Sequence, residues 1–234
     1  MKFLMVFALL PLGAFQQQPE TPFRYVERPS FRVEDLGSGY RPPGTLVYEA
    51  VLENVTASYA TGEESFSSYL PDGTKHDECK GNGFTVVPGG KVRVQCQSGS
   101  APFDIRLQVT MRLRDVRTYM PTPESTRVTV TEQGVRRLDH GTTFFTSNPY
   151  FDPYEVWALL QSRGGDAKVK YAFRLYDKDG IQIAEAFHSE SIVVEPEVKR
   201  RVNWETKFYK REKPVSVRTY VFDISEPAKK GAAK

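Results

Sequence analysis

The feature that most constrains the fold is an alternation of apolar and polar residues from Phe103 to Leu113. A period of two over this length predicts a long β-strand with one buried and one solvent-facing side. The same alternation recurs over 169–175 and 215–221. No stretch sustains the spacing of an amphipathic helix, and the nearest one, Glu155–Gln161, is too short for a stable helix. Short strands between Gly, Pro and Asp turns predict an all-β protein of sandwich type.

An internal repeat indicates that the chain contains two such units. The pattern Phe-x-x-Tyr-x-x-Asp-Gly occurs over 66–73 and again over 173–180. Further matches keep the same order: Tyr48-Glu49 with Tyr154-Glu155, Val86-Val87-Pro88 with Val193-Val194-Glu195-Pro196, and Lys91-x-Arg93-Val94 with Lys199-x-Arg201-Val202. We interpret them as an internal duplication that produces two tandem Ig-like β-sandwich domains. The alternative is two unrelated sets of strands that share common turn chemistry.

The length of 234 residues suits two domains of about 100 residues, each with its own core. We place domain 1 at 21–120 and domain 2 at 124–226, joined by a Pro-containing linker at 121–123. A leader at 15–20 precedes the first domain, and a basic tail at 227–234 follows the second. Between Gln16 and Pro43 the sequence predicts one strand, at 31–33.

The N-terminus has the organisation of a signal peptide over residues 1–14. Lys2 precedes an apolar run at 3–10, and small residues then lead to a cleavage site after Ala14. The apolar run is too short to span a bilayer, so we expect an exported, periplasmic or secreted protein without stable membrane insertion.

The two cysteines, Cys79 and Cys96, are expected to form a disulfide, because thiols of an exported chain usually pair. In the repeat, Cys79 aligns with Ala186 and Cys96 with Trp204. The bridge would then fill interior space that a small residue and an aromatic residue fill in domain 2. The alternative is two unrelated thiols in separate loops.

The segment Phe173-Arg174-Leu175-Tyr176-Asp177 spells the signature of the FxLYD domain. The chain from Tyr154 to Ile224 resembles that family of small bacterial extracytoplasmic β-sandwiches of Ig-like character. Most members have no assigned activity, so the resemblance implies a fold for domain 2 and supplies no catalytic residues.

No motif in the sequence indicates catalysis, a metal or a cofactor. The three histidines, His76, His140 and His188, lie in polar stretches without metal-ligand spacing, and no Gly-x-Ser-x-Gly elbow occurs. The segment 177–180 begins like a calcium loop but lacks the remaining ligands. A formal net charge of +3, with basic residues spread along the chain, predicts no nucleic-acid partner. We therefore expect a non-catalytic binding or structural protein, with an unrecognised hydrolase as the alternative.

An aromatic segment is the first candidate for a binding site. Rings on a sandwich loop can stack on sugars or receive apolar side chains of a protein partner. The alternative is that they form the first core strand of domain 2 and its lead-in. The candidate contacts are Phe144, Phe145, Tyr150, Phe151, Tyr154 and Trp157.

Three kinds of partner follow from these features. A protein of the cell envelope is the first hypothesis, and a glycan bound by the aromatic segment is the alternative. A third comes from the strand Leu107–Arg114, which resembles the strand before the hinge in periplasmic pilus chaperones. Those proteins are exported pairs of Ig-like domains that add a strand to a subunit.

Overall fold

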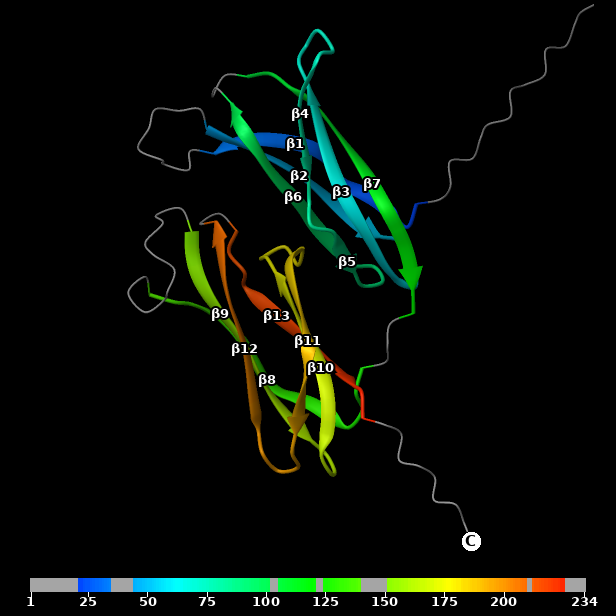
Figure 1. Ribbon diagram of the computed structural model, residues 1–234, viewed down its shortest axis with the longest axis vertical. Helices are drawn as coiled ribbons and strands as arrows, with labels where there is room; N and C mark the ends of the chain where they lie inside the picture. Colours follow the sequence, from blue (N-terminus) through cyan, green and yellow to red (C-terminus); the bar gives the residue numbers. More distant parts are fainter. Residues whose placement is uncertain are drawn as a thin grey trace, which may run out of the picture.

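The computed structural model describes residues 21–34, 44–101, 105–120, 124–139, 151–209 and 212–225. These residues form β-strands, which confirms the predicted all-β class (Figure 1). The strands are β1 (Phe23–Glu34), β2 (Gly44–Asn54), β3 (Tyr59–Tyr69), β4 (Lys75–Lys80), β5 (Phe84–Val86), β6 (Lys91–Ala101), β7 (Gln108–Tyr119), β8 (Val128–Arg137), β9 (Phe151–Ser162), β10 (Ala167–Tyr176), β11 (Gln182–Val194), β12 (Arg200–Tyr209) and β13 (Ser216–Asp223). Within the described ranges, no helix has the length and apolar character needed to cross a membrane.

The first half of the chain is a sandwich of two antiparallel sheets. In one sheet β2 lies between β1 and β6, and in the other β3 lies between β7 and the pair β4 and β5. Both sheets bury alternate side chains in one core, in which Tyr48, Leu52, Phe66 and Val86 are at most 1% exposed. The alternation in the sequence therefore gives each sheet its inner face.

The second half repeats this arrangement. Strand β9 lies between β8 and β12, and β10 lies between β11 and β13. Its core includes Val156, Leu160, Phe173 and Leu175, none of which has measurable exposure. The sheet β1-β2-β6 thus corresponds to β8-β9-β12, and β3 with its neighbours corresponds to β10 with β11 and β13.

The cross-strand partners in the two halves agree with the alignment of the two sequence repeats. Phe66 lies opposite Cys79, and Phe173 lies opposite Ala186, as the alignment of the two halves requires. The duplication itself stays a hypothesis, because unrelated domains also share sandwich architecture.

The predicted disulfide joins Cys79 of β4 to Cys96 of β6, with the two Cα atoms 5.9 Å apart. This separation is ordinary for a disulfide, and the bridge connects the two sheets of the first sandwich. In the second half, Trp204 packs half-buried against the core.

Two strand boundaries differ from the sequence predictions. Strand β1 extends well beyond the predicted 31–33. Glu155–Gln161, rejected as a helix in the sequence analysis, belongs to β9. Strand β7 begins at Gln108, while Ile105 and Leu107 pack against the core ahead of it; Phe103 lies outside the described residues.

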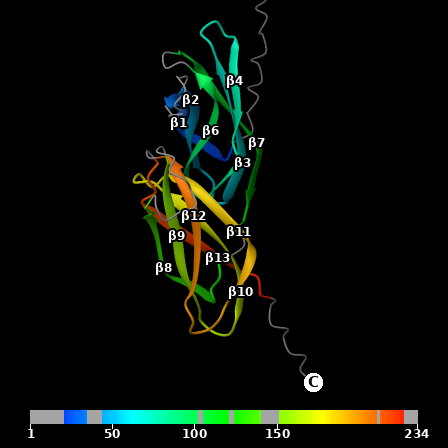
Figure 2. The ribbon, with the colours of Figure 1, turned by 60° about the vertical axis from the view of Figure 1, so that its left-hand side comes forward.

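The two halves meet where β6 and β11 pair in parallel at Val92 and Gln182, which makes one six-stranded sheet from strands of both domains (Figures 1 and 2). Side-chain contacts across the seam add to this pairing. Arg93 Nη1 lies 3.0 Å from Asp177 Oδ2, and Gln182 Nε2 donates to the carbonyl oxygen of Thr85 at 3.0 Å.

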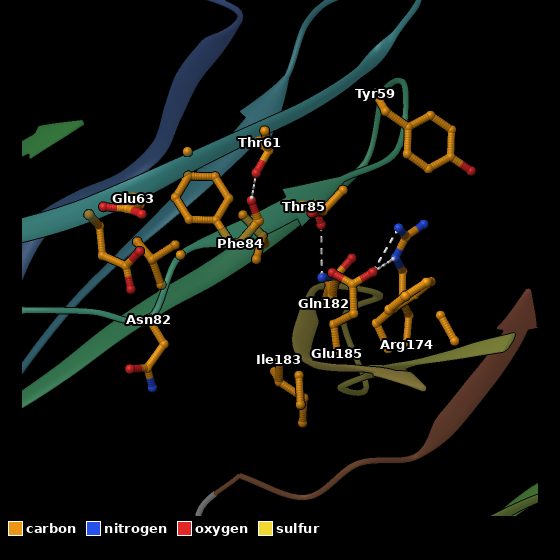
Figure 3. Close-up of a pocket in the computed structure, with 18 of the residues that line it drawn as sticks. Tyr59, Thr61, Glu63, Asn82, Phe84, Thr85, Arg174, Gln182, Ile183 and Glu185 are labelled. Carbon is orange, nitrogen blue, oxygen red and sulfur yellow. Dashed lines mark hydrogen bonds and ion pairs between the residues drawn. The ribbon is translucent and has the colours of Figure 1, made fainter. Parts of the chain in front are cut away.

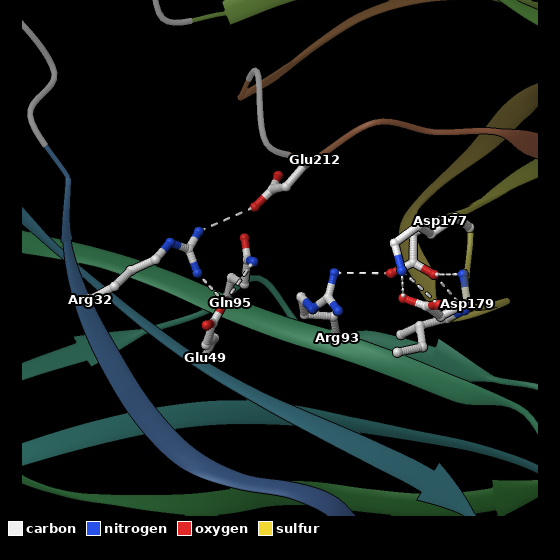
Figure 4. A network of polar contacts seen from close by, with 9 residues as sticks. Arg32, Glu49, Arg93, Gln95, Asp177, Asp179 and Glu212 are labelled. Carbon is white, nitrogen blue, oxygen red and sulfur yellow. Dashed lines mark hydrogen bonds and ion pairs between the residues drawn. The ribbon is translucent and has the colours of Figure 1, made fainter.

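A second polar cluster lies beside the seam, centred on Arg32 of β1 (Figure 4). The Arg32 guanidinium contacts Glu34 at 2.6 Å, contacts Glu49, and reaches Glu212 of the second half at 3.5 Å. Burial raises the pKa of Glu212, and the facing cation Arg32 and the side chain of Gln95 only partly offset that rise.

Candidate functional site: the groove between the two sandwiches

The aromatic segment predicted as a site is only partly described. Phe144, Phe145 and Tyr150 lie outside the described residues, and for Phe151 only the backbone in β9 is described. Tyr154 is 6% exposed, and its ring packs edge-on against Phe208 at 5.8 Å. Tyr154 therefore packs in the core, which was the alternative to a role in binding.

Trp157 lies on the opposite side of β9 from Tyr154, because side chains alternate along a strand. It is half-buried, with the guanidinium of Arg201 5.3 Å from the ring centre. Gly134 of β8 leaves room for it, since a Cβ there would be 3.0 Å from the indole. The two described rings therefore do not form one surface.

A groove of about 1320 Å³ lies between the two sandwiches (Figure 3). Strands β3, β5, β6 and β7 line it from the first half, and β10, β11, β12 and β13 line it from the second. Its aromatic side chains are Tyr59, Phe84, Tyr119, Phe187, Trp204 and Phe222. No local pattern in the sequence predicts it, because its walls come from positions far apart in the chain.

The charges that line the groove balance. Four basic side chains, Arg93, Arg117, Lys170 and Arg174, stand against four acidic ones, Glu63, Glu64, Asp115 and Glu185. A balanced lining gives no net field that would select a strongly charged ligand.

The Asp-Gly turn of the repeat comes just before Gln182 and Ile183, which line the groove. The Oδ1 atom of Asp177 accepts the backbone N–H groups of Asp179 at 2.9 Å and Ile181 at 3.0 Å. Gly180 has a φ of 72°, a conformation that favours glycine. The same carboxylate pairs with Arg93 through Oδ2, so one side chain shapes the turn and positions the second sandwich against the first.

Arg174 of β10 is the most unusual residue of the groove. Arg174 is only 3% exposed. Its Nε and Nη2 atoms lie 2.9 Å and 2.8 Å from Glu185 Oε1. The ring centres of Tyr220 and Tyr59 lie 4.4 Å and 5.1 Å from its guanidinium carbon. Its Nη1 atom is buried and has no hydrogen-bond partner among the described residues.

The pKa shifts around Arg174 follow from burial and from this pairing. Burial alone lowers the pKa of Arg174, but Glu185 and Tyr220 outweigh it and raise the pKa overall. Burial raises the pKa of Glu185, and the charge of Arg174 offsets that rise only in part. Burial likewise raises the pKa of Tyr59, and Arg174 counteracts it.

Glu64 of β3 is a second buried polar group in the groove wall. It is 5% exposed, and its Oε2 atom has no hydrogen-bond partner in the described part of the chain. Burial raises its pKa. Gly81 packs directly on this carboxylate, so any larger residue at position 81 would collide with the Glu64 side chain.

The arrangement suits binding. Among the described residues, no group of three or more His, Cys, Asp or Glu side chains is placed to hold a metal ion. Buried donors and acceptors without partners, between two aromatic-lined walls, are instead what a site offers to a ligand that brings its own hydrogen-bonding groups.

Comparisons with known proteins identify no family. No family model matches the chain, and no curated protein matches it. Among solved structures, a β-glucuronidase from glycoside hydrolase family 2 is similar with 12% identity and a TM-score of 0.27, over 76% of this chain and 21% of that chain. This chain therefore spans about a fifth of that enzyme's length.

Two smaller structures are also similar. The CBM22-1-CBM22-2 tandem domain of Xyn10C from Paenibacillus barcinonensis gives 8% identity and a TM-score of 0.19, over 89% of this chain and 88% of that chain. The CBD12 structure from CALX1.2 gives 13% identity and a TM-score of 0.22, over 83% and 79%. TM-scores of this size support no assignment of function.

Proposed function

We propose that the protein is a non-catalytic, extracytoplasmic binding protein, specifically a protein-interaction module of the cell envelope. The observation that carries this proposal is the groove of about 1320 Å³, whose walls contain buried polar atoms without partners and aromatic rings. The seam contacts of Arg93 and Gln182 hold the two walls together before any partner arrives. A pre-formed site of this kind lowers the entropy cost of binding.

The proposed location outside the cytoplasm rests on two further observations. The Cys79–Cys96 disulfide is typical of oxidising compartments. The first 14 residues have the pattern of a signal peptide. Mass spectrometry of protein from its native compartment should find an N-terminus at Phe15, and soluble cytoplasmic protein that retains Met1 would contradict export.

Membership of the FxLYD family is proposed for the second half on its five-residue signature. In support, Phe173 and Leu175 are fully buried in the core and Asp177 shapes the turn at the seam. The signature thus consists of residues with packing and turn roles.

Photo-crosslinking tests the binding proposal. A photoreactive phenylalanine at position 187, which lines the groove and is 59% exposed, should crosslink to a protein in envelope extracts. The same group at Val198, which is 53% exposed and does not line the groove, is the matched control. Equal labelling from both positions, or labelling from position 198 alone, would contradict the proposal.

A glycan remains the second candidate, favoured by the half-buried ring of Trp157 on the outer face of β9. Replacement of Trp157 by Ala would then abolish retention on a polysaccharide column while thermal unfolding stays unchanged. Strand addition, as in the pilus chaperones, is a third candidate. In the described residues β7 pairs only with β3 and so presents a free edge.

A further inference from the structure

The unpartnered nitrogen of Arg174 indicates what kind of group the groove receives. A buried donor without an acceptor has lost its hydration without compensation, and the loss is larger when the donor is charged, so such a group normally meets a ligand or a water. Figure 3 shows that the third nitrogen of the guanidinium points away from Glu185 and toward the side of Tyr59. Arg174 itself lines the groove.

The direction of approach is restricted. Tyr220 and Tyr59 lie near the guanidinium, at 4.4 Å and 5.1 Å from its carbon, and Glu185 occupies one edge. Because a guanidinium is planar and its N–H bonds lie in that plane, an acceptor has to reach Nη1 edge-on. A single projecting oxygen meets this requirement.

Electrostatics favour an oxygen without a formal charge. Glu185 already neutralises Arg174, and the other basic and acidic side chains of the groove balance. A carboxylate would lose its hydration here without meeting a net positive charge. A carbonyl oxygen is a good acceptor and has a much smaller desolvation cost.

Glu64, the second buried group without a partner among the described residues, has the opposite hydrogen-bonding character, which points to an amide ligand. Glu64 offers an oxygen acceptor where Arg174 offers a donor, and both line the same groove. A polypeptide main chain carries both kinds of group, a carbonyl acceptor and an N–H donor, in every unit.

The rings of the groove suit side chains better than sugars. Phe187 and Phe222 lie 6.3 Å apart at 46°, so these two rings do not form the flat platform on which a sugar stacks. Tilted rings instead leave gaps that apolar side chains can fill.

We propose that the groove binds an extended polypeptide segment without charged side chains, and that Nη1 of Arg174 donates a hydrogen bond to one of its main-chain carbonyl oxygens. This inference rests on the proposed function and adds the recognised group and the residue that recognises it.

Nuclear magnetic resonance on the full mature protein tests it without any mutation. The probe is the peptide acetyl-Ser-Val-Ser-Val-Ser-amide, with acetate as a carboxylate probe and cellopentaose as a neutral glycan. We expect the peptide to shift the side-chain N–H signals of Arg174 and the indole signal of Trp204, and we expect acetate and cellopentaose to leave them in place.

A variant adds a quantitative test. Arg174→Lys should weaken the affinity for the peptide about tenfold or more, as the loss of a charge-assisted hydrogen bond predicts. Arg201→Lys is the matched control, because Arg201 lies outside the groove lining and should leave the affinity unchanged. Circular dichroism checks that both variants are folded. If Arg174→Lys does not fold, the wild-type resonance signals of Arg174 and Trp204 alone test the proposal.

Each other result overturns the inference. Peptide binding that moves Trp204 but not Arg174 would reject the role of Arg174 and leave the proposed function standing. An equal response to acetate would reject the uncharged ligand, and a response to cellopentaose alone would reject the peptide. No response to any probe would mean that Arg174 holds only a resident water, while crosslinking from position 187 would still test the proposed function separately.

Discussion

Removal of the Cys79–Cys96 disulfide should destabilise the first sandwich and leave the second unchanged. The two cysteines are 17 positions apart, and closing a loop of that length in the unfolded chain stabilises the native state by about 3 kcal/mol. The bridge also joins the two sheets of the sandwich, and both residues are under 10% exposed. We therefore expect a loss of about 3 kcal/mol in the unfolding free energy of the double variant Cys79→Ala/Cys96→Ala.

The placement of the tryptophans allows each half to be followed separately. Both Trp residues, Trp157 and Trp204, belong to the second half. In a urea titration, tryptophan fluorescence should keep its midpoint, while far-ultraviolet circular dichroism should show an additional transition at lower urea. A reductant should reproduce this change in the wild type and have no effect on the variant. If both signals shift together, the halves unfold as one unit, and a loss below about 1 kcal/mol would refute the chain-entropy reasoning.

Three more predictions concern the turn, the groove and domain independence. Asp177→Ala removes an acceptor of two N–H groups and the partner of Arg93, so chemical denaturation should show a loss of about 2–3 kcal/mol, whereas Asp177→Asn, which keeps an amide oxygen at that position, should lose about 1 kcal/mol. A similar loss from both would show that the turn does not depend on Oδ1. Burial raises the pKa of Glu64, so its contribution to stability is present below the ordinary glutamate pKa and is lost as the pH rises through the raised value. Glu64→Gln should therefore gain stability relative to the wild type between pH 4 and pH 7 in thermal melts, and a constant difference would contradict this. A fragment of residues 124–226 should unfold cooperatively with a β-type circular dichroism spectrum, since it has its own core; a disordered fragment would refute independent folding.

The sequence predicted the features that depend on local pattern. Alternation placed the strands of the two cores, and the Asp-Gly spacing placed the turn at Asp177 and Gly180. The disulfide was predicted because the chain has two cysteines and the thiols of an exported chain usually pair. Each of these depends on residues that are close in sequence or unique in the chain.

Strand β1 was underestimated for a physical reason. Its residues from Arg24 to Pro29 are mostly exposed and include a proline, which disfavours strand in most positions. An edge strand tolerates proline, and β1 lies at the edge of its sheet with two register shifts. Edge position is a property of the assembled sheet, so the local pattern does not reveal it.

The groove could not be predicted from the sequence, because it forms only where the two sandwiches pack against each other. Tyr59, Arg174 and Glu185 come from different strands of the two halves, and none stands in a recognisable motif for binding. Arg174 even lies inside the five-residue signature as its variable position. Its burial depends on how the second sandwich meets the first, which hydrophobic periodicity within one strand does not encode.

The pairing of β6 with β11 has a mechanical consequence. The sheet is continuous across the two domains, but the parallel junction consists of the single pair Val92 and Gln182. Tension applied to the two ends of the chain would load this junction before the long antiparallel ladders within each domain. The protein should then lengthen in a first, low-force step that separates the sandwiches intact and splits the groove into its two walls. If the groove holds a peptide segment as proposed, this step would release the segment without unfolding either domain.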